Sequence, residues 1–192
     1  LRDADIVVNA LPGSIGLEPT IEALNCGKTV ALANKESLVM GGRLIRNIIA
    51  RTDAELIPVD SEHSAIYQLL KGMDLGEVKS IIITASGGPF RKHTRKALES
   101  VELSDAMNHP TWKMGRKITL DSATLMNKGL EIIEARWLFD LEPSRIRTLV
   151  HPESIIHGIV ELSDNSFFAY MANPDMKIPI AYALYGAKRS AL

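Results

Sequence analysis

The first sixty residues alternate between short apolar runs and helix-like stretches, and this alternation restricts the fold more than any other feature of the chain. The apolar runs and the helix-like segments follow one another in the order 6–10, 18–24, 29–33, 37–50 and 55–59. Strands that are separated by helices form parallel sheets through right-handed crossovers. We therefore expect residues 1–60 to form part of an α/β parallel sheet.

After residue 60 the pattern changes, which predicts a domain boundary at this point. Strand-like runs become predominant, with expected strands at 79–85, 147–150, 154–162 and 167–171 and expected helices at 65–70, 122–140 and 179–185. The stretch 86–116 reads as loop-rich, although 94–101 could form a helix. Residues 122–140 give the clearest helix, because four apolar residues in it fall at helical spacing: Met126, Leu130, Ile133 and Trp137. This half of the chain is therefore expected to be α+β.

The charge composition excludes two classes of partner. The net charge is -1, from 22 basic and 23 acidic residues, and no basic stripe appears, so neither nucleic acid nor an anionic membrane surface is an expected partner. No apolar run approaches the roughly 20 residues of a membrane span, and no signal peptide is visible. Cys26 is the single cysteine, which excludes an internal disulfide and favours a reducing compartment.

Two acidic segments suggest a metal site. Asp60 and Glu62 follow the apolar run 55–59, and Glu131 lies in the predicted helix 122–140. Ligands of open α/β sheets bind at the carboxyl ends of the strands, and clustered carboxylates suit Mg²⁺ or Mn²⁺. If the strand continues through Glu62, both carboxylates point to one side. The alternative is an ordinary helix start, where Asp, Ser and Glu are all favoured.

The predicted helix 122–140 carries further polar groups beside Glu131. Asn127, Lys128 and Glu131 span an arc of roughly 100° next to the apolar stripe, which suits an anionic ligand. The alternative is a surface ion pair between Lys128 and Glu131, worth only a few tenths of a kcal/mol. Gly129 weakens a helix by about 1 kcal/mol relative to Ala, which a surface pair does not explain. Close approach of a ligand or of another backbone would explain it, so we favour the ligand interpretation.

Weaker signals come from four other segments. Ser86-Gly87-Gly88 and Ser122 could bind a phosphate through N–H and hydroxyl groups, the latter helped by a helix dipole, although such residues are common in turns. The segment 109–116 contains Trp112, which either anchors the loop or covers a ligand as a lid together with His109. Residues 34–36 follow the second strand at the same edge as Asp60. We assign no role to His63, His93 or His157, and we read 151–154 as a turn.

Six segments together resemble the 1-deoxy-D-xylulose-5-phosphate reductoisomerase family. In chain order they are 33–39 (ANKESLV), 58–63 (PVDSEH), 85–90 (ASGGPF), 109–115 (HPTWKMG), 121–131 (DSATLMNKGLE) and 151–154 (HPES). The resemblance covers essentially the whole chain. It implies a reaction of the non-mevalonate isoprenoid pathway, in which 1-deoxy-D-xylulose 5-phosphate is rearranged and the resulting aldehyde is reduced by NADPH to 2-C-methyl-D-erythritol 4-phosphate. It also implies a homodimer, in which the strands between 147 and 171 take part.

The resemblance also assigns roles to individual residues. The metal, Mg²⁺ or Mn²⁺, is held by residues that match Asp60, Glu62 and Glu131. Catalysis is assigned to these three carboxylates together with Lys35 and His109. Substrate contacts are assigned to Lys35, Ser61, Glu62, Ser86, His109, Trp112, Ser122, Asn127, Lys128 and Glu131. Contacts to NADPH are assigned to Asn34, Glu36 and Gly115.

The same resemblance implies how the chain is organised. Residues 1–60 correspond to the second half of a Rossmann-like NADPH domain, 61–186 to the catalytic and dimerisation domain with its lid, and 187–192 to the start of a linker. The family's Gly-rich pyrophosphate turn and its C-terminal helical domain have no counterpart here. We therefore expect a fragment that retains the metal and substrate groups, binds NADPH poorly and turns over little.

Two other functions remain open from the sequence. One is a different metal-dependent NADP oxidoreductase or a sugar-phosphate isomerase, and the other is a module that only binds ligands and dimerises. The expected location is the bacterial cytoplasm, or a plastid-type organelle if the source is eukaryotic.

Overall fold

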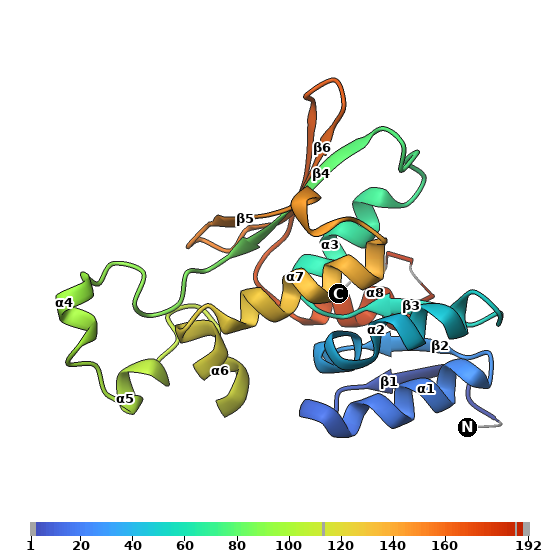
Figure 1. The fold of residues 1–192 in the computed structure, drawn as a ribbon, viewed down its shortest axis with the longest axis horizontal. Helices are drawn as coiled ribbons and strands as arrows, with labels where there is room; N and C mark the ends of the chain where they lie inside the picture. Colours follow the sequence, from blue (N-terminus) through green and yellow to red (C-terminus); the bar gives the residue numbers. More distant parts are fainter. Residues whose placement is uncertain (1–2, 113, 187, 190–192) are drawn as a thin grey trace.

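The computed structural model describes residues 3–112, 114–186 and 188–189 (Figure 1). In chain order the elements are β1 (Ile6–Asn9), η1 (Gly13–Gly16), α1 (Leu17–Asn25), β2 (Thr29–Leu32), α2 (Lys35–Ile49), β3 (Leu56–Pro58), α3 (Ser61–Leu70), β4 (Val78–Ala85), α4 (Arg95–Leu98), α5 (Leu103–Ala106), α6 (Arg116–Ala123), α7 (Met126–Phe139), η2 (Pro143–Arg145), β5 (Ile146–Val150), β6 (Ile156–Leu162), β7 (Phe167–Met171) and α8 (Lys177–Leu184). Residues 187 and 190–192 of the expected linker lie outside the described residues.

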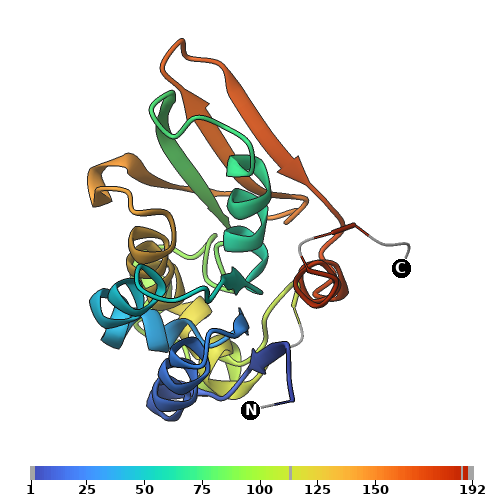
Figure 2. The ribbon, with the colours of Figure 1, turned by 90° about the vertical axis from the view of Figure 1, so that its right-hand side faces the viewer.

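The first three strands form a parallel sheet in the order β1-β2-β3, as the alternation of strands and helices predicts. Side chains alternate across this sheet. Val30 and Leu32 of β2 pack into a core with α1 and α2, while Ala31 packs on the other face with Tyr182 and Ala183 of α8. Figure 2 shows α8 on the side of this sheet opposite to α1 and α2. The end of the described chain thus returns to cover the sheet at its beginning.

The second sheet has the order β5-β4-β6-β7 and is mixed. β4 and β5 are parallel, whereas β6 pairs antiparallel with both β4 and β7. The turn between β6 and β7 contains Asn165 at φ 67°, which fits the hairpin predicted there. Ile81 and Ile83 of β4 form the core of this half with Ile66 of α3 and Phe139 of α7. The α/β class followed by α+β is therefore confirmed.

Helices α2 and α7 join the two halves of the molecule. Gly42 of α2 lies so close to Trp137 of α7 that an added Cβ would come within 2.2 Å of the indole ring. Real side chains do not tolerate such a distance, so glycine at this position permits the close packing. The division into domains at residue 60 stays a prediction.

Three local expectations need correction. First, β3 ends at Pro58 and α3 begins at Ser61 with Asp60 at its N-cap, so the extended reading of 60–62 is wrong and the helix-start reading is right. Second, the expected helix 122–140 is two helices, because Leu125 adopts a left-handed conformation (φ 60°) between α6 and α7. Leucine rarely adopts positive φ, so the sequence carries no signal for this break.

Third, the apolar stripe of α7 is not its buried face. Met126 and Ile133 are exposed, whereas Lys128, Glu131 and Glu134 are buried. The helix lies between the two halves of the molecule and directs its charged side toward the interior. Periodicity shows only where apolar residues recur along a helix. The charged side of α7 can be buried because Lys128 and Glu131 form an ion pair inside the protein.

The described residues 86–112 and 114–115 form an extended connection between β4 and α6, and within them only the short helices α4 and α5 occur. In Figure 1 this connection projects from the body of the molecule at the left. The prediction of a loop-rich segment is confirmed, and the helix expected at 94–101 is reduced to Arg95–Leu98. Among the described helices, none has the length and apolar character needed to cross a membrane.

Candidate active site

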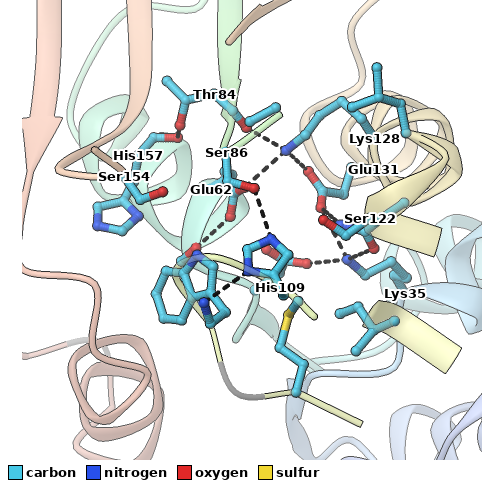
Figure 3. Close-up of a pocket in the computed structure, with 18 of the residues that line it drawn as sticks. Lys35, Glu62, Thr84, Ser86, His109, Ser122, Lys128, Glu131, Ser154 and His157 are labelled. Carbon is cyan, nitrogen blue, oxygen red and sulfur yellow. Dashed lines mark hydrogen bonds and ion pairs between the residues drawn. The ribbon is translucent and has the colours of Figure 1, made fainter. Parts of the chain in front are cut away.

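A cavity of about 280 Å³ lies where the ends of β3 and β4 meet α7 and the connection 86–115. Most of the side chains that the sequence singled out line it, namely Lys35, Asp60, Ser61, Glu62, Ser86, His109, Trp112, Ser122, Asn127, Lys128 and Glu131. These residues come from segments up to 96 positions apart in the sequence. The fold therefore brings together residues from both halves of the chain (Figure 3).

Three carboxylates converge at the floor of this cavity. Asp60 lies at the N-cap of α3, Glu62 is in its first turn, and Glu131 reaches them from α7. One oxygen from each lies within 4.8 Å of the others. The Glu131 side chain is almost fully buried, at 1% exposure. Such a set of hard oxygen donors is what Mg²⁺ and Mn²⁺ prefer.

Two lysine ammonium groups lie between these carboxylates. Lys35 Nζ pairs with Asp60, with Glu131 Oε1 at 3.2 Å and with Asn127 Oδ1 at 2.9 Å. Lys128 Nζ pairs with Glu131, with Glu62 Oε1 at 2.9 Å and with the carbonyl of Thr84. Figure 3 shows these contacts converging from opposite sides on Glu131. The two ammonium groups thus compensate part of the negative charge of the three carboxylates within the protein.

The surroundings of Glu62 and Asp60 shift the pKa values of these two carboxyl groups in opposite directions. Burial, reinforced by the neighbouring Glu131 and Asp60 and opposed by Lys128, raises the pKa of Glu62 to about 7. Burial also acts on Asp60, but Lys35 and His63 outweigh it and hold the pKa of Asp60 well below its usual value. Burial works to lower the pKa of Lys35. The carboxylates of Asp60 and Glu131 outweigh burial and raise this pKa. Glu62 therefore gains a proton near neutral pH, whereas Asp60 stays ionised there.

His109 organises the mouth of the cavity. Its Nδ1 accepts hydrogen bonds from the backbone N–H groups of Thr111 (3.2 Å) and Trp112 (2.9 Å). Because Nδ1 accepts, a neutral ring carries its proton on Nε2, which lies 3.0 Å from Ser86 Oγ. Burial and the nearby Arg91 lower the pKa of His109, which favours this neutral form. The loop that carries Trp112 is thereby held over the cavity.

Ser86, Ser122 and Lys128 all line the cavity. Gly88, at φ 66°, allows the turn after β4 to approach α6 so closely that a Cβ there would come within 2.7 Å of the Ser122 carbonyl oxygen. Ser122 lies in the last turn of α6, not at the start of a long helix, so the dipole argument for an anion at Ser122 is wrong. The hydroxyls and the ammonium remain as donors for an anion.

Two family models match the chain in consecutive parts. Residues 1–42 match the model described as 1-deoxy-D-xylulose 5-phosphate reductoisomerase, and residues 56–139 match the model of its C-terminal domain. Reductoisomerases from Protochlamydia amoebophila and from Bacillus subtilis are each 55% identical to the chain, over 182 and 184 residues that cover 95% and 96% of it. The chain belongs to the 1-deoxy-D-xylulose 5-phosphate reductoisomerase family. It spans about half the length of these relatives (47% and 48%).

Solved reductoisomerase structures share the fold. One, a complex with NADPH, fosmidomycin and magnesium, has a TM-score of 0.92 at 43% identity and covers 99% of this chain and 49% of its own. The Zymomonas mobilis reductoisomerase in complex with NADPH has a TM-score of 0.90 at 46% identity and covers 98% of this chain and 48% of its own. The family resemblance seen in the sequence is confirmed.

The residues that the reductoisomerase resemblance assigns to NADPH lie outside the cavity lining. Asn34 caps α2 by accepting from the Ser37 backbone N–H at 2.9 Å, and its amide donates to the Gly13 carbonyl at 2.9 Å. Glu36 pairs with Lys117 at 2.8 Å, and Gly115 is the N-cap of α6 just before Lys117. The structure therefore brings the three residues to one region between α2 and α6. Their role toward NADPH stays a prediction.

Sequence reasoning missed a buried pair beneath the reductoisomerase carboxylates. His63 is fully buried and Glu134 is 1% exposed. Burial raises the pKa of Glu134, whereas for His63 the carboxylates of Glu134 and Asp60 outweigh burial and raise the pKa to about 9. The available signal was spacing: His63 lies three residues after Asp60, and Glu134 three after Glu131. Thr84 and His157 also line the cavity, and for them we find no sequence signal; Ser154 lines it too, although we read its segment 151–154 as a turn.

Proposed function

We propose that this chain carries the metal and substrate site of an enzyme that rearranges 1-deoxy-D-xylulose 5-phosphate and reduces the product with NADPH to 2-C-methyl-D-erythritol 4-phosphate. The observation that carries the proposal is the convergence of Asp60, Glu62 and Glu131 within 4.8 Å. A reductoisomerase of the same fold has been solved with NADPH, fosmidomycin and magnesium, which supports it.

A divalent cation suits the donor set of this site. Three buried or half-buried carboxylates supply only oxygen, and the positive charges now among them belong to Lys35 and Lys128. The proposed ligands are Asp60, Glu62 and Glu131, and the proposed metal is Mg²⁺ or Mn²⁺. When bound, such an ion supplies Lewis acidity toward the ketone and hydroxyl oxygens of the substrate.

The chain's own residues would bind the other end of the substrate. The ammonium of Lys128 and the hydroxyls of Ser86 and Ser122 face the cavity and can donate to a phosphate. Lys128 is now held by Glu62 and Glu131. A cation that takes over these carboxylates frees the Lys128 ammonium for the phosphate, which couples the two ends of the site.

The remaining groups would orient the substrate and exclude water. Lys35 and Asn127 are hydrogen-bonded to each other at 2.9 Å beside the carboxylates and can donate to substrate hydroxyls, as can Ser61. Trp112 and His109 cover the cavity from the connection 86–115, which suits a lid. Asn34, Glu36 and Gly115 are the proposed contacts to NADPH.

The test combines Mn²⁺ with fosmidomycin, a ligand of a solved relative. We expect the chain to bind fosmidomycin in calorimetry only when Mn²⁺ is present, and we expect Glu131→Gln to abolish both binding events with an unchanged circular dichroism spectrum. Glu142→Gln, at a side chain that is 71% exposed and outside the cavity, serves as the matched control. Tight Mn²⁺ binding by Glu131→Gln would remove the basis of the proposed function.

We also propose that the chain forms a homodimer through the free edge of its second sheet. β7 is the last strand in the sheet order, and its Phe167, Phe168 and Met171 are all exposed. Exposed apolar edge strands pair readily with a second copy. Sedimentation velocity should give a dimer, and Phe168→Lys should shift it toward monomer. A monomer at all concentrations tested would refute this interface.

The proposed location is the bacterial cytoplasm, because the two relatives named above are bacterial reductoisomerases. Recovery of the protein in the membrane fraction of lysed source cells would contradict this.

A further inference from the structure

The buried pair of His63 and Glu134 has no part in the proposed chemistry, yet it lies directly under the metal ligands. His63 Nδ1 is 3.5 Å from Glu134 Oε2, and neither atom has a hydrogen-bond partner among the described residues. Both side chains are almost without solvent contact. Burying two such groups is costly unless they interact favourably. Their retention under the site therefore calls for a reason.

The groups around the His63 ring indicate which of its nitrogens carry a proton. Its Nε2 lies 2.9 Å from the backbone carbonyl oxygen of Glu131, which can only accept, so Nε2 donates. Its Nδ1 faces Glu134 Oε2 at 3.5 Å and Asp60 Oδ1 at 3.9 Å. Carboxylate oxygens also accept. The ring therefore presents an N–H on both sides and attracts oxygens from two helices.

These contacts span the gap between the proposed metal ligands. His63 lies on α3, directly after the segment that supplies Asp60 and Glu62, whereas Glu131 and Glu134 lie on α7. The other oxygen of Asp60, Oδ2, is turned toward Lys35 and the cavity. The ring thus lies between the back of Asp60, 3.9 Å from its Nδ1, and the backbone carbonyl of Glu131, 2.9 Å from its Nε2. Phe139 stacks on it, with ring centroids 6.3 Å apart, and limits its movement.

We propose that Glu134 is a positioning residue: its carboxylate orients His63, which in turn sets the spacing of Asp60 and Glu131 for a divalent cation. The inference rests on the proposed metal site. Outer-shell partners of this kind act by orienting ligands, and their loss weakens metal affinity by about 10- to 100-fold.

The experiment is a Mn²⁺ titration of the purified chain followed by electron paramagnetic resonance. Glu134→Gln keeps the size of the side chain and removes its charge. We expect it to weaken Mn²⁺ binding at least tenfold and to alter the spectrum of the bound ion, with an unchanged circular dichroism spectrum. Glu142→Gln, at the exposed residue just beyond α7, should bind as the wild type does. Glu134→Asp keeps the charge one methylene further from His63 and should fall between wild type and Glu134→Gln.

The outcomes separate the two proposals. If the wild type binds Mn²⁺ and Glu134→Gln binds it equally well with the same spectrum, the positioning role is overturned and the metal site stands. If the wild type binds no Mn²⁺, the proposed metal site fails and the positioning role fails with it.

A competing explanation is a second cation, because Asp60, His63 and Glu134 also offer atoms within 4.8 Å of one another. Two Mn²⁺ per wild-type chain and one per Glu134→Gln chain would overturn the positioning role. If Glu134→Gln does not fold, Glu134→Asp decides, since wild-type affinity in that variant is incompatible with a positioning role.

Discussion

At the scale of single residues, the protonation state of Glu62 controls how strongly the site binds a cation. Burial and the adjacent carboxylates of Glu131 and Asp60 bring the pKa of Glu62 to about 7, although Lys128 opposes them. Asp60 behaves oppositely, since Lys35 and His63 keep its pKa low despite burial. Below neutral pH a cation must therefore displace a proton from Glu62, whereas Asp60 is already ionised.

This gives a pH dependence of metal binding. A pKa of Glu62 raised to about 7 means that the protonated form predominates below that pH and the ionised form above it. Because only the ionised form binds a cation, the affinity for Mn²⁺ should rise by about tenfold per pH unit from pH 5 to 7 and level off above 7. Calorimetric titrations at a series of pH values measure this.

The matched control for this pH series is Glu62→Gln, which removes the titrating group. The variant should bind Mn²⁺ more weakly and lose the steep rise between pH 5 and 7. An affinity that is independent of pH in the wild type would show that Glu62 is already ionised and that the cavity does not raise its pKa.

The sequence showed some residues of the site and hid others for physical reasons. Asp60 and Glu62 were visible because they follow a strand whose carboxyl end must face a ligand crevice. The three-residue spacing places His63 near Asp60 and Glu134 near Glu131, but it does not show that the two side chains are buried, and a glutamate usually lies at the surface. Their burial depends on each other's charge across two helices that are distant in sequence, which no local pattern reports.

At the scale of elements, α7 determines the architecture of the site. It presents Lys128, Glu131 and Glu134 to the interior and packs its Trp137 on Gly42 of α2. Its existence was predictable from periodicity, but its start was not, because the break before it depends on the left-handed Leu125. Which of its faces is buried also could not be predicted, because the burial of its charged side depends on partners distant in sequence, such as Lys35 and Glu62.

Alanine substitutions at Gly42 and Gly129 test the packing of α7 on α2. A Cβ at Gly42 would come within 2.2 Å of the Trp137 ring, whereas one at Gly129 of α7 would meet nothing within 4 Å. Gly42→Ala should therefore lower the free energy of unfolding by about 1–3 kcal/mol through overpacking. Gly129→Ala should raise it by about 0.5–1 kcal/mol through helix propensity. Urea unfolding of both variants measures these changes.

The Gly129 variant also answers a question from the sequence. A Cβ at Gly129 would meet nothing within 4 Å among the described residues, so the close approach of another backbone does not explain this glycine, and Gly129 is not among the residues that line the cavity. Gly129→Ala should then be more stable, and unchanged fosmidomycin binding would rule out the ligand interpretation of this glycine. If Gly42→Ala were as stable as Gly129→Ala, the close contact between α2 and α7 would be contradicted.

At the scale of the whole molecule, the site exists only because the two sheets are held together. Lys35 comes from the helix after β2, Asp60 follows β3, and Glu131 comes from a helix that packs on the second sheet. The classes of the two sheets were predictable, because strand periodicity and the intervening helices are local properties. The return of α8 to the first sheet was not, since it depends on an apolar cluster of residues more than 120 positions apart, such as Val59 and Tyr182.

The central claim is that Asp60, Glu62 and Glu131 share one divalent cation. The most direct measurement is anomalous X-ray scattering from crystals of this protein grown with Mn²⁺. We expect one strong anomalous peak, with oxygens of all three carboxylates about 2.1 Å from it. A peak elsewhere, or no peak in a crystal that is saturated with Mn²⁺, would contradict the claim.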